Sequence, residues 1–156
     1  RRSRINVEKN RLSGSIRILH RDVRKLHDVF RKASFDLITV NPPFFPIHRD
    51  HQGTSGAEKN ARQEILGSLR FFLQAANYLG STRSDLYIIY HPSRLDYLFR
   101  EVHRTEFTCK ELQFIHHQDG RALFVLVHCL KGGGDGVRVL PPCFIQETLK
   151  AGFKEE

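Results

Sequence analysis

FDLITVNPPFFP, residues 35–46, is an apolar run of strand-forming residues that ends abruptly in two prolines and two aromatic residues. Residues 37–40 predict a buried strand of a parallel sheet, because such strands read as continuous apolar runs. Pro42 has no N–H to donate to a neighbouring strand, so we expect the strand to stop there. Asn41, whose backbone the following proline restricts, then lies at the carboxyl end of the strand, where α/β sheets bind ligands.

The residues at this strand end suit one kind of chemistry. The exocyclic amine of adenine is a poor nucleophile because its lone pair is delocalised into the ring. The side-chain oxygen of Asn41 and the carbonyl of Pro42 can each accept one of its N–H groups, which would localise and aim that lone pair. Phe44 offers a face on which the base can stack. A plain turn that ends a strand is the alternative, since Asn and Pro are common in turns.

The same residues carry a family resemblance. FDLITVNPPFFP resembles the [DN]PP[YF] motif of class I S-adenosylmethionine-dependent methyltransferases, which modify adenine N6 or glutamine N5. Phe44 stands where the family usually has Tyr, which keeps the stacking face but loses a hydroxyl group. Three further segments are similar to bacterial tRNA1(Val) (adenine-37-N6)-methyltransferases, so that the resemblance extends over most of the chain: ARQEI at 61–65, LKGG at 130–133 and VLPP at 139–142.

This resemblance implies methyl transfer from S-adenosylmethionine to N6 of an adenine in tRNA, with an anticodon-loop nucleotide splayed out of its stack. The catalytic residues it implies are consecutive: Asn41, Pro42, Pro43 and Phe44. The cofactor contacts it implies are Asp22, Val23 and Asn41. We place contacts with the RNA at Phe45, at the end of the motif, and at His48 and Arg49 in the polar loop that follows. A further RNA contact is placed at Arg62, beyond that loop.

Asp22 has two interpretations that can both hold. It follows a predicted strand, Ser15–His20, and in the resemblance an acidic residue at this strand end contacts the adenine of the cofactor. It also precedes a predicted helix, Val23–Phe30, and Asp is a preferred helix N-cap. The loop 47–60 carries His48 and His51 without an HExxH pattern or a partner cluster, so no metal site is expected.

Composition limits the class of protein. The 156 residues suit a single domain, 1–156, and a net charge of +8 favours a polyanionic partner such as nucleic acid. The chain has no apolar run long enough to cross a membrane, and its first residues are too charged for a signal peptide. Its three cysteines are odd in number and lack CxxC spacing, which favours reduced thiols and a cytoplasmic location.

The remaining pattern predicts an α/β fold. We expect a helix over residues 1–12 that ends near Ser13-Gly14, a helix over 61–79, and a helix opened by a capping-box variant at Ser93 and Asp96. Residues 110–117 and 121–130 predict two strands joined across Asp119-Gly120 as an antiparallel hairpin. The resemblance implies a Rossmann-like methyltransferase sheet, mostly parallel, with this hairpin at its C-terminal edge.

The cofactor half of such an enzyme is expected to be incomplete. No GxGxxG and no acidic-glycine run precedes Asn41, so we expect the sheet to lack its first two strands and Ser15–His20 to lack neighbours. The 156 residues alone are therefore expected to bind cofactor weakly or not at all.

Two other functions stay open from the sequence. One is glutamine N5 methylation of a protein of release-factor type, which uses the same pair of acceptors. The other is a catalytically silent, basic RNA-binding remnant. The charge and the ARQE and VLPP segments favour RNA as substrate. The sequence does not indicate an oligomeric state.

Overall fold

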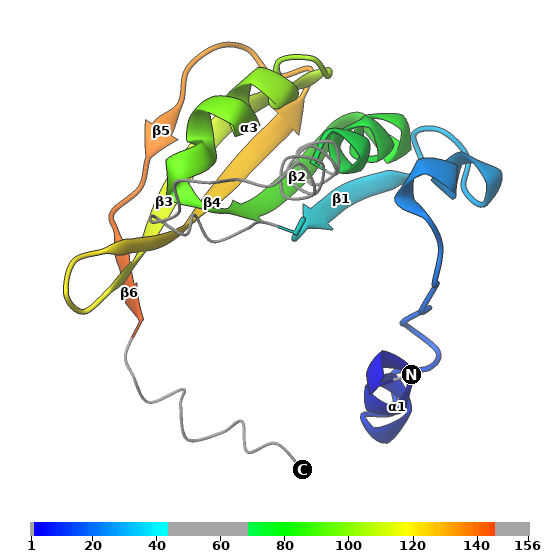
Figure 1. The fold of residues 1–156 in the computed structure, drawn as a ribbon. Helices are drawn as coiled ribbons and strands as arrows, with labels where there is room; N and C mark the ends of the chain where they lie inside the picture. Colours follow the sequence, from blue (N-terminus) through cyan, green and yellow to red (C-terminus); the bar gives the residue numbers. More distant parts are fainter. Residues whose placement is uncertain (1, 44–68, 146–156) are drawn as a thin grey trace, which may run out of the picture.

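A six-stranded sheet organises the computed structural model, which describes residues 2–43 and 69–145 (Figure 1). The strand order is β1-β2-β4-β3-β5, and β6 also pairs with β3. Strand β4 is antiparallel to both neighbours, whereas the other pairs are parallel, which confirms a mostly parallel α/β sheet with a C-terminal hairpin. The strands are β1 (Phe35–Val40), β2 (Gly80–Tyr90), β3 (Phe107–His117), β4 (Ala122–Lys131), β5 (Arg138–Val139) and β6 (Cys143–Ile145).

Two helices cover one face of this sheet (Figure 1). They are the helical residues 69–79 and α3 (Leu95–Val102), which follows the short 3-10 helix η2 (Pro92–Arg94). Their apolar stripes pack on the alternate residues of the central strands, which buries both sets from water. The largest buried members of this core are Leu69, Leu73, Leu86, Ile88, Leu98, Val102, Val125 and Val127.

The hairpin between β3 and β4 turns where the sequence predicts it. Gly120 has φ +85°, a left-handed conformation that glycine adopts without steric cost. Its N–H donates to the His117 carbonyl at 3.0 Å, and the His117 N–H donates to the Arg121 carbonyl at 2.9 Å. The Asp-Gly prediction is therefore confirmed.

Strand β1 lies at the edge of the described sheet, and the prediction of a buried strand is wrong for one of its faces. Val40 is buried with the core, but Leu37 is 58% exposed. Leu37 pairs with Asp85 and Thr39 with Tyr87, so these side chains share the face that the two helices leave uncovered. An apolar run cannot distinguish a strand covered on both faces from one covered on a single face.

The segment before β1 is less regular than predicted. Residues 16–20 form no strand, and Ile16 and Leu19 are exposed. Because no described strand lies beside this segment, its backbone groups have no ladder to join. Helix α1 (Arg2–Lys9) is confirmed but ends before Ser13-Gly14, since Arg11 takes a left-handed φ of +57° and Leu12 donates back to the Val7 carbonyl.

The predicted capping box at Ser93 and Asp96 is wrong. His91 is the N-cap of η2, and its Nδ1 accepts the Ser93 N–H at 3.3 Å. Pro92 then occupies the first helical turn, where its missing N–H costs nothing. Helix α3 begins one turn later, with Arg94 as an N-cap whose side chain makes no capping hydrogen bond.

Candidate functional site

The carboxyl end of β1 presents Asn41 to solvent. Asn41 and Pro43 are exposed, whereas the Pro42 side chain between them is fully buried. The buried ring fixes where the chain leaves the sheet, and the prolines restrict the backbone on either side. The Asn41 side chain makes no hydrogen bond with any residue that the structure describes. The backbone of Asn41 is therefore placed at the end of the strand, and its side-chain amide is exposed.

The carboxyl end of β2 lies beside it. Val40 pairs with Ile88 in parallel register, so both strands leave the sheet at the same edge. His91 follows β2 and shares a 2.7 Å hydrogen bond between its Nδ1 and the Ser93 hydroxyl. The sequence analysis did not single out His91. The signal that could have identified His91 is the His91-Pro92 pair. It ends β2 just as Asn41-Pro42 ends β1, and two neighbouring parallel strands that stop at proline leave the sheet at the same edge.

Asp22 and Val23 stand at the start of the 3-10 helix η1 (Val23–Asp28), which is shorter than the predicted helix. The Asp22 carboxylate accepts the Arg24 backbone N–H at 2.9 Å and also binds the Arg24 guanidinium through both oxygens. These hydrogen bonds lower the pKa of Asp22 to about 2 and raise the pKa of Arg24. The capping interpretation is confirmed; the contact with a cofactor stays a prediction.

The structure brings together only part of the predicted site. Asn41, Pro42 and Pro43 are consecutive at the carboxyl edge, and no hydrogen bond between described residues joins Asp22 or Val23 to Asn41. The other predicted residues lie outside the described ranges: Phe44, Phe45, His48, Arg49 and Arg62. Within residues 2–43 and 69–145 there is no cluster of three or more His, Cys, Asp or Glu side chains that could hold a metal ion. None of the helices in those ranges has the length and apolar character that a membrane crossing demands.

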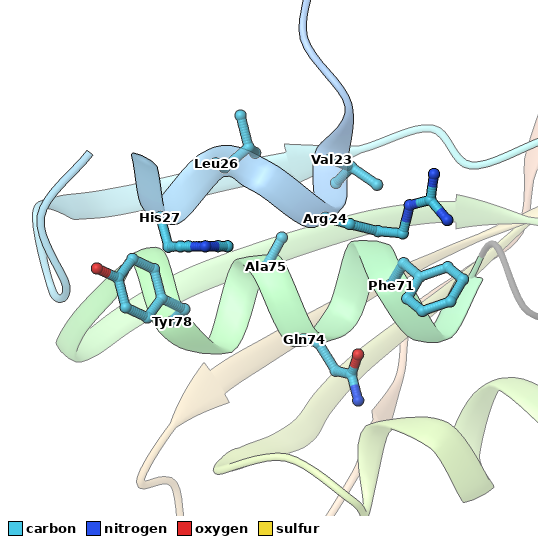
Figure 2. A pocket seen from close by; sticks show the side chains of 8 residues that line it. All are labelled: Val23, Arg24, Leu26, His27, Phe71, Gln74, Ala75 and Tyr78. Atoms are coloured by element: carbon cyan, nitrogen blue, oxygen red, sulfur yellow. The ribbon is translucent and has the colours of Figure 1, made fainter. Parts of the chain in front are cut away.

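A concave site that includes no residue of this motif lies in a groove between η1 and the helical residues 69–79 (Figure 2). Its volume is about 540 Å³. The sequence analysis missed it, although Phe71 and Tyr78 lie seven residues apart, with Gln74 and Ala75 between them. That spacing places them on one side of a helix, beside the buried stripe. The groove is lined by Val23, Arg24, Leu26, His27, Phe71, Gln74, Ala75 and Tyr78.

The two sites differ in what they can do chemically. The edge site offers amide and carbonyl acceptors at a strand end, an arrangement that can orient an amine. The groove offers aromatic faces, a guanidinium group and an amide, an arrangement that can bind a planar, anionic ligand. The edge site is the better candidate for a reaction.

Comparison with solved structures assigns the fold. A predicted O-methyltransferase from Agrobacterium tumefaciens matches with a TM-score of 0.65 and 17% identity over 93% of this chain. TrmN from Thermus thermophilus matches with a TM-score of 0.58 and 19% identity over 83% of this chain. A putative DNA modification methylase from the same organism, complexed with S-adenosyl-L-methionine, matches with a TM-score of 0.55 and 15% identity over 74%. The chain therefore has a methyltransferase fold.

The chain spans only part of these proteins. The matches cover 62% of the Agrobacterium chain, 32% of TrmN and 55% of the DNA modification methylase. No protein-family model matches the sequence, and no curated protein matches it either.

Proposed function

We propose that this chain carries the amine-binding half of an S-adenosylmethionine-dependent methyltransferase whose substrate is N6 of an adenine in tRNA. The observation that carries the proposal is the exposed Asn41 amide, fixed at the carboxyl end of β1 by the buried Pro42, within a methyltransferase fold. An exposed Asn also suits a plain turn, so the exposed amide supports the proposal through its motif and through its place in a methyltransferase fold.

The chain's own residues act on the amine. The Asn41 Oδ1 and the Pro42 carbonyl each accept one N6 hydrogen, which directs the nitrogen lone pair out of the plane of the base. The cofactor, when bound, supplies a methyl group on a sulfonium sulfur. Transfer of this methyl group to N6 would break the S–CH3 bond, and the methylated nitrogen would then lose one proton to water. No strong general base is needed, because the amine becomes acidic only after it gains the methyl group.

Asp22 fits a role at the adenine end of the cofactor. Its carboxylate stays ionised across the neutral range because the Arg24 hydrogen bonds hold the pKa of Asp22 at about 2. Its side chain is still 34% exposed. An ionised, partly exposed carboxylate can accept a hydrogen bond from an adenine amine, while its cap keeps Val23 in place.

Several observations support nucleic acid as the substrate class. The net charge of +8 favours a polyanion, and one structural neighbour is described as a DNA modification methylase. The choice of tRNA rests on the ARQEI, LKGG and VLPP segments, and a tRNA substrate agrees with a cytoplasmic location. A glutamine side chain in a protein is the competing substrate, because its amide nitrogen also has two hydrogens.

A single-turnover assay tests the proposal. The chain, in excess over substrate and with millimolar methyl-labelled S-adenosylmethionine, is offered unmodified tRNA, a DNA oligonucleotide and a glutamine-containing peptide. We expect label in N6-methyladenosine of the tRNA, and a loss of about 100-fold or more in Asn41→Ala because one of the two acceptors is gone. Asn10→Ala is the matched control, since Asn10 is an exposed asparagine just after α1.

The alternatives give different outcomes. Label in the peptide alone would assign the chain to glutamine methylation, and label in DNA alone would move the substrate from tRNA to DNA. No label anywhere, with binding of both tRNA and S-adenosylmethionine shown, would favour the silent RNA-binding remnant. Equal rates in Asn41→Ala and Asn10→Ala would remove Asn41 from the reaction.

A further inference from the structure

We propose that the groove between η1 and the helical residues 69–79 binds one unstacked nucleotide of a single-stranded nucleic acid. The inference deepens the proposed function, on which it rests for the choice of a nucleic acid as partner. None of the eight lining residues belongs to the Asn-Pro-Pro motif, and one of them, Val23, is also a predicted cofactor contact, so the groove adjoins the predicted cofactor site. The lining side chains, their order along the groove and the charge around it all point to such a ligand.

Aromatic rings stand at both ends of the groove. Phe71 is 38% exposed, and the Arg24 guanidinium lies 5.6 Å from its ring centroid. At the other end, the Tyr78 and His27 rings meet edge to face with centroids 6.4 Å apart. Figure 2 shows Arg24 beside Phe71 and His27 beside Tyr78. Every nucleobase has a π face that can stack on such rings, so this arrangement binds bases without requiring one sequence.

The middle of the groove supplies a polar group over an apolar floor. Gln74 lies one turn from both Phe71 and Tyr78, and Figure 2 shows its exposed amide directed away from η1, on the outer side of the groove, where it can donate to and accept from the edge of a base. Leu26 and Ala75 are among the apolar residues that line the groove. This combination of an apolar floor, two ring platforms and one amide is what a planar heterocycle requires.

The Tyr78 ring is already fixed in place. Its hydroxyl donates to the Phe30 carbonyl at 3.3 Å. The hydroxyl is thus engaged with the protein, and the half-buried ring, which also contacts His27, keeps an exposed part on which a ligand can stack. A platform that does not move on binding loses little side-chain entropy, which favours stacking.

The charge around the groove favours a phosphodiester strand over an uncharged ligand. The Arg24 charge is largely matched by Asp22, and Asp28 contacts His27 at 3.1 Å. Asp22 and Asp28 are the only acidic residues in segments 20–34 and 69–79, and the basic residues of these segments outnumber them. The further basic residues of those segments are Arg21, Lys25, Arg31, Lys32 and Arg70. The two segments that form the groove therefore carry a net positive charge, which attracts the phosphates of a nucleic acid strand.

Binding by the full chain tests the inference directly. Fluorescence anisotropy of a labelled single-stranded RNA of about 12 nucleotides, within the site sizes of such proteins, is measured for the wild-type protein, for Phe71→Ala and for Phe144→Ala. We expect Phe71→Ala to weaken binding about fivefold or more, the range expected for one lost base–aromatic stack. Phe144 is the matched control because it is 55% exposed on β6, outside the groove, and we expect less than about a twofold change there.

A second measurement needs no variant. The wild-type chain is irradiated with the same RNA carrying 5-iodouridine, and the cross-linked peptides are identified by mass spectrometry. We expect cross-links at Phe71 or Tyr78. Single-stranded DNA of the same sequence shows whether the groove distinguishes RNA, and duplex RNA should neither cross-link there nor respond to Phe71→Ala.

The outcomes separate this inference from the proposed function. Unchanged binding in Phe71→Ala, an equal loss in Phe144→Ala, or cross-links only outside the groove would each overturn it. Neither measurement needs methyl transfer or S-adenosylmethionine. A chain that binds RNA at Phe71 but methylates nothing would refute the enzyme and keep the groove. If wild type and Phe71→Ala bind tRNA equally well and methylate it at the same rate, the proposed enzyme is kept and the groove inference is refuted.

Discussion

The two faces of the sheet are built from the same strands yet meet different surroundings. On the covered face, Ile88 and Val127 are at most 1% exposed beneath the two helices. On the opposite face, Leu37, Tyr87 and Leu126 are 58%, 43% and 36% exposed. Side chains alternate along a strand because of its backbone geometry, but which set is buried depends on where the helices lie. Alternation is thus a local property, and burial is not.

Polar pairs stabilise the open face in place of packing. The His128 Nε2 lies 2.7 Å from the Asp85 Oδ1, and the Tyr87 ring stacks on the imidazole with centroids 4.6 Å apart. Glu111, on the neighbouring strand, binds the Arg138 guanidinium and so connects β5 to β3. Cross-strand pairs of this kind contribute little individually, so most of the stability is expected to come from the covered face.

The largest expected effect compares one leucine from each face. Leu98 on α3 is fully buried, and Leu98→Ala should lower the free energy of unfolding by about 2–5 kcal/mol because it leaves a cavity. Leu37→Ala removes the same atoms from an exposed site and should cost less than about 1 kcal/mol. Urea denaturation of the two variants gives both values. Similar losses would mean that the open face is also packed in solution.

A smaller loss of stability is expected from replacing Lys131, a buried lysine at the end of β4. Lys131 is buried, and its Nζ donates to the Asn77 carbonyl at 2.7 Å and the Gly80 carbonyl at 2.9 Å, at the end of the helical residues 69–79. Lys131→Met keeps the stem but leaves these carbonyls without that donor, which should cost about 1–3 kcal/mol. Lys110 makes the same kind of contact with two loop carbonyls in an exposed place, Gly134 and Asp135.

Lys110→Met is therefore the control for Lys131→Met, measured by the same urea denaturation. Water can replace the exposed donor, so the control should change stability by less than about 0.5 kcal/mol. The interpretation fails if the two variants lose the same amount.

The smallest effect is a pH dependence on the open face. The hydrogen bond from Arg138 lowers the pKa of Glu111 in the folded chain below its value in the unfolded chain. A lowered carboxyl pKa adds stability above the unfolded value, near 4.5, and this contribution disappears as the pH falls through the folded value. The protection factors of the β5 amides, which correct for the slower intrinsic exchange in acid, should therefore fall at low pH before those of β2 do.

Glu111→Gln provides the control for that experiment, because glutamine does not ionise in this range. Its β5 amides should have lower protection factors than those of wild type near neutral pH, and these factors should not fall further in acid through this pair. A variant with wild-type behaviour at every pH would show that the ion pair does not connect β5 to the sheet.

Much of the fold could be predicted from local patterns. The β1 strand with its proline stop, the Asp119-Gly120 turn and the buried helical stripe of Leu69 and Leu73 follow from backbone restriction and from periodicity. The predictions that failed depended on contacts between separate parts of the chain. Residues 15–20 have a strand pattern but no described neighbour to pair with, and His91 rather than Ser93 provides the cap because Pro92 fixes where the helical turn begins.

The candidate sites divide in the same way. The sequence by itself determined the chemistry of the edge site, because Asn41 and the two prolines are consecutive and need no folding to be neighbours. Only the tertiary structure decided that Asn41 is exposed while Pro42 is buried, and only it brought Arg24 and Phe71 together from distant parts of the chain. The physical reason is that sequence order fixes local backbone geometry, whereas burial and concave surfaces arise where separate elements pack against each other.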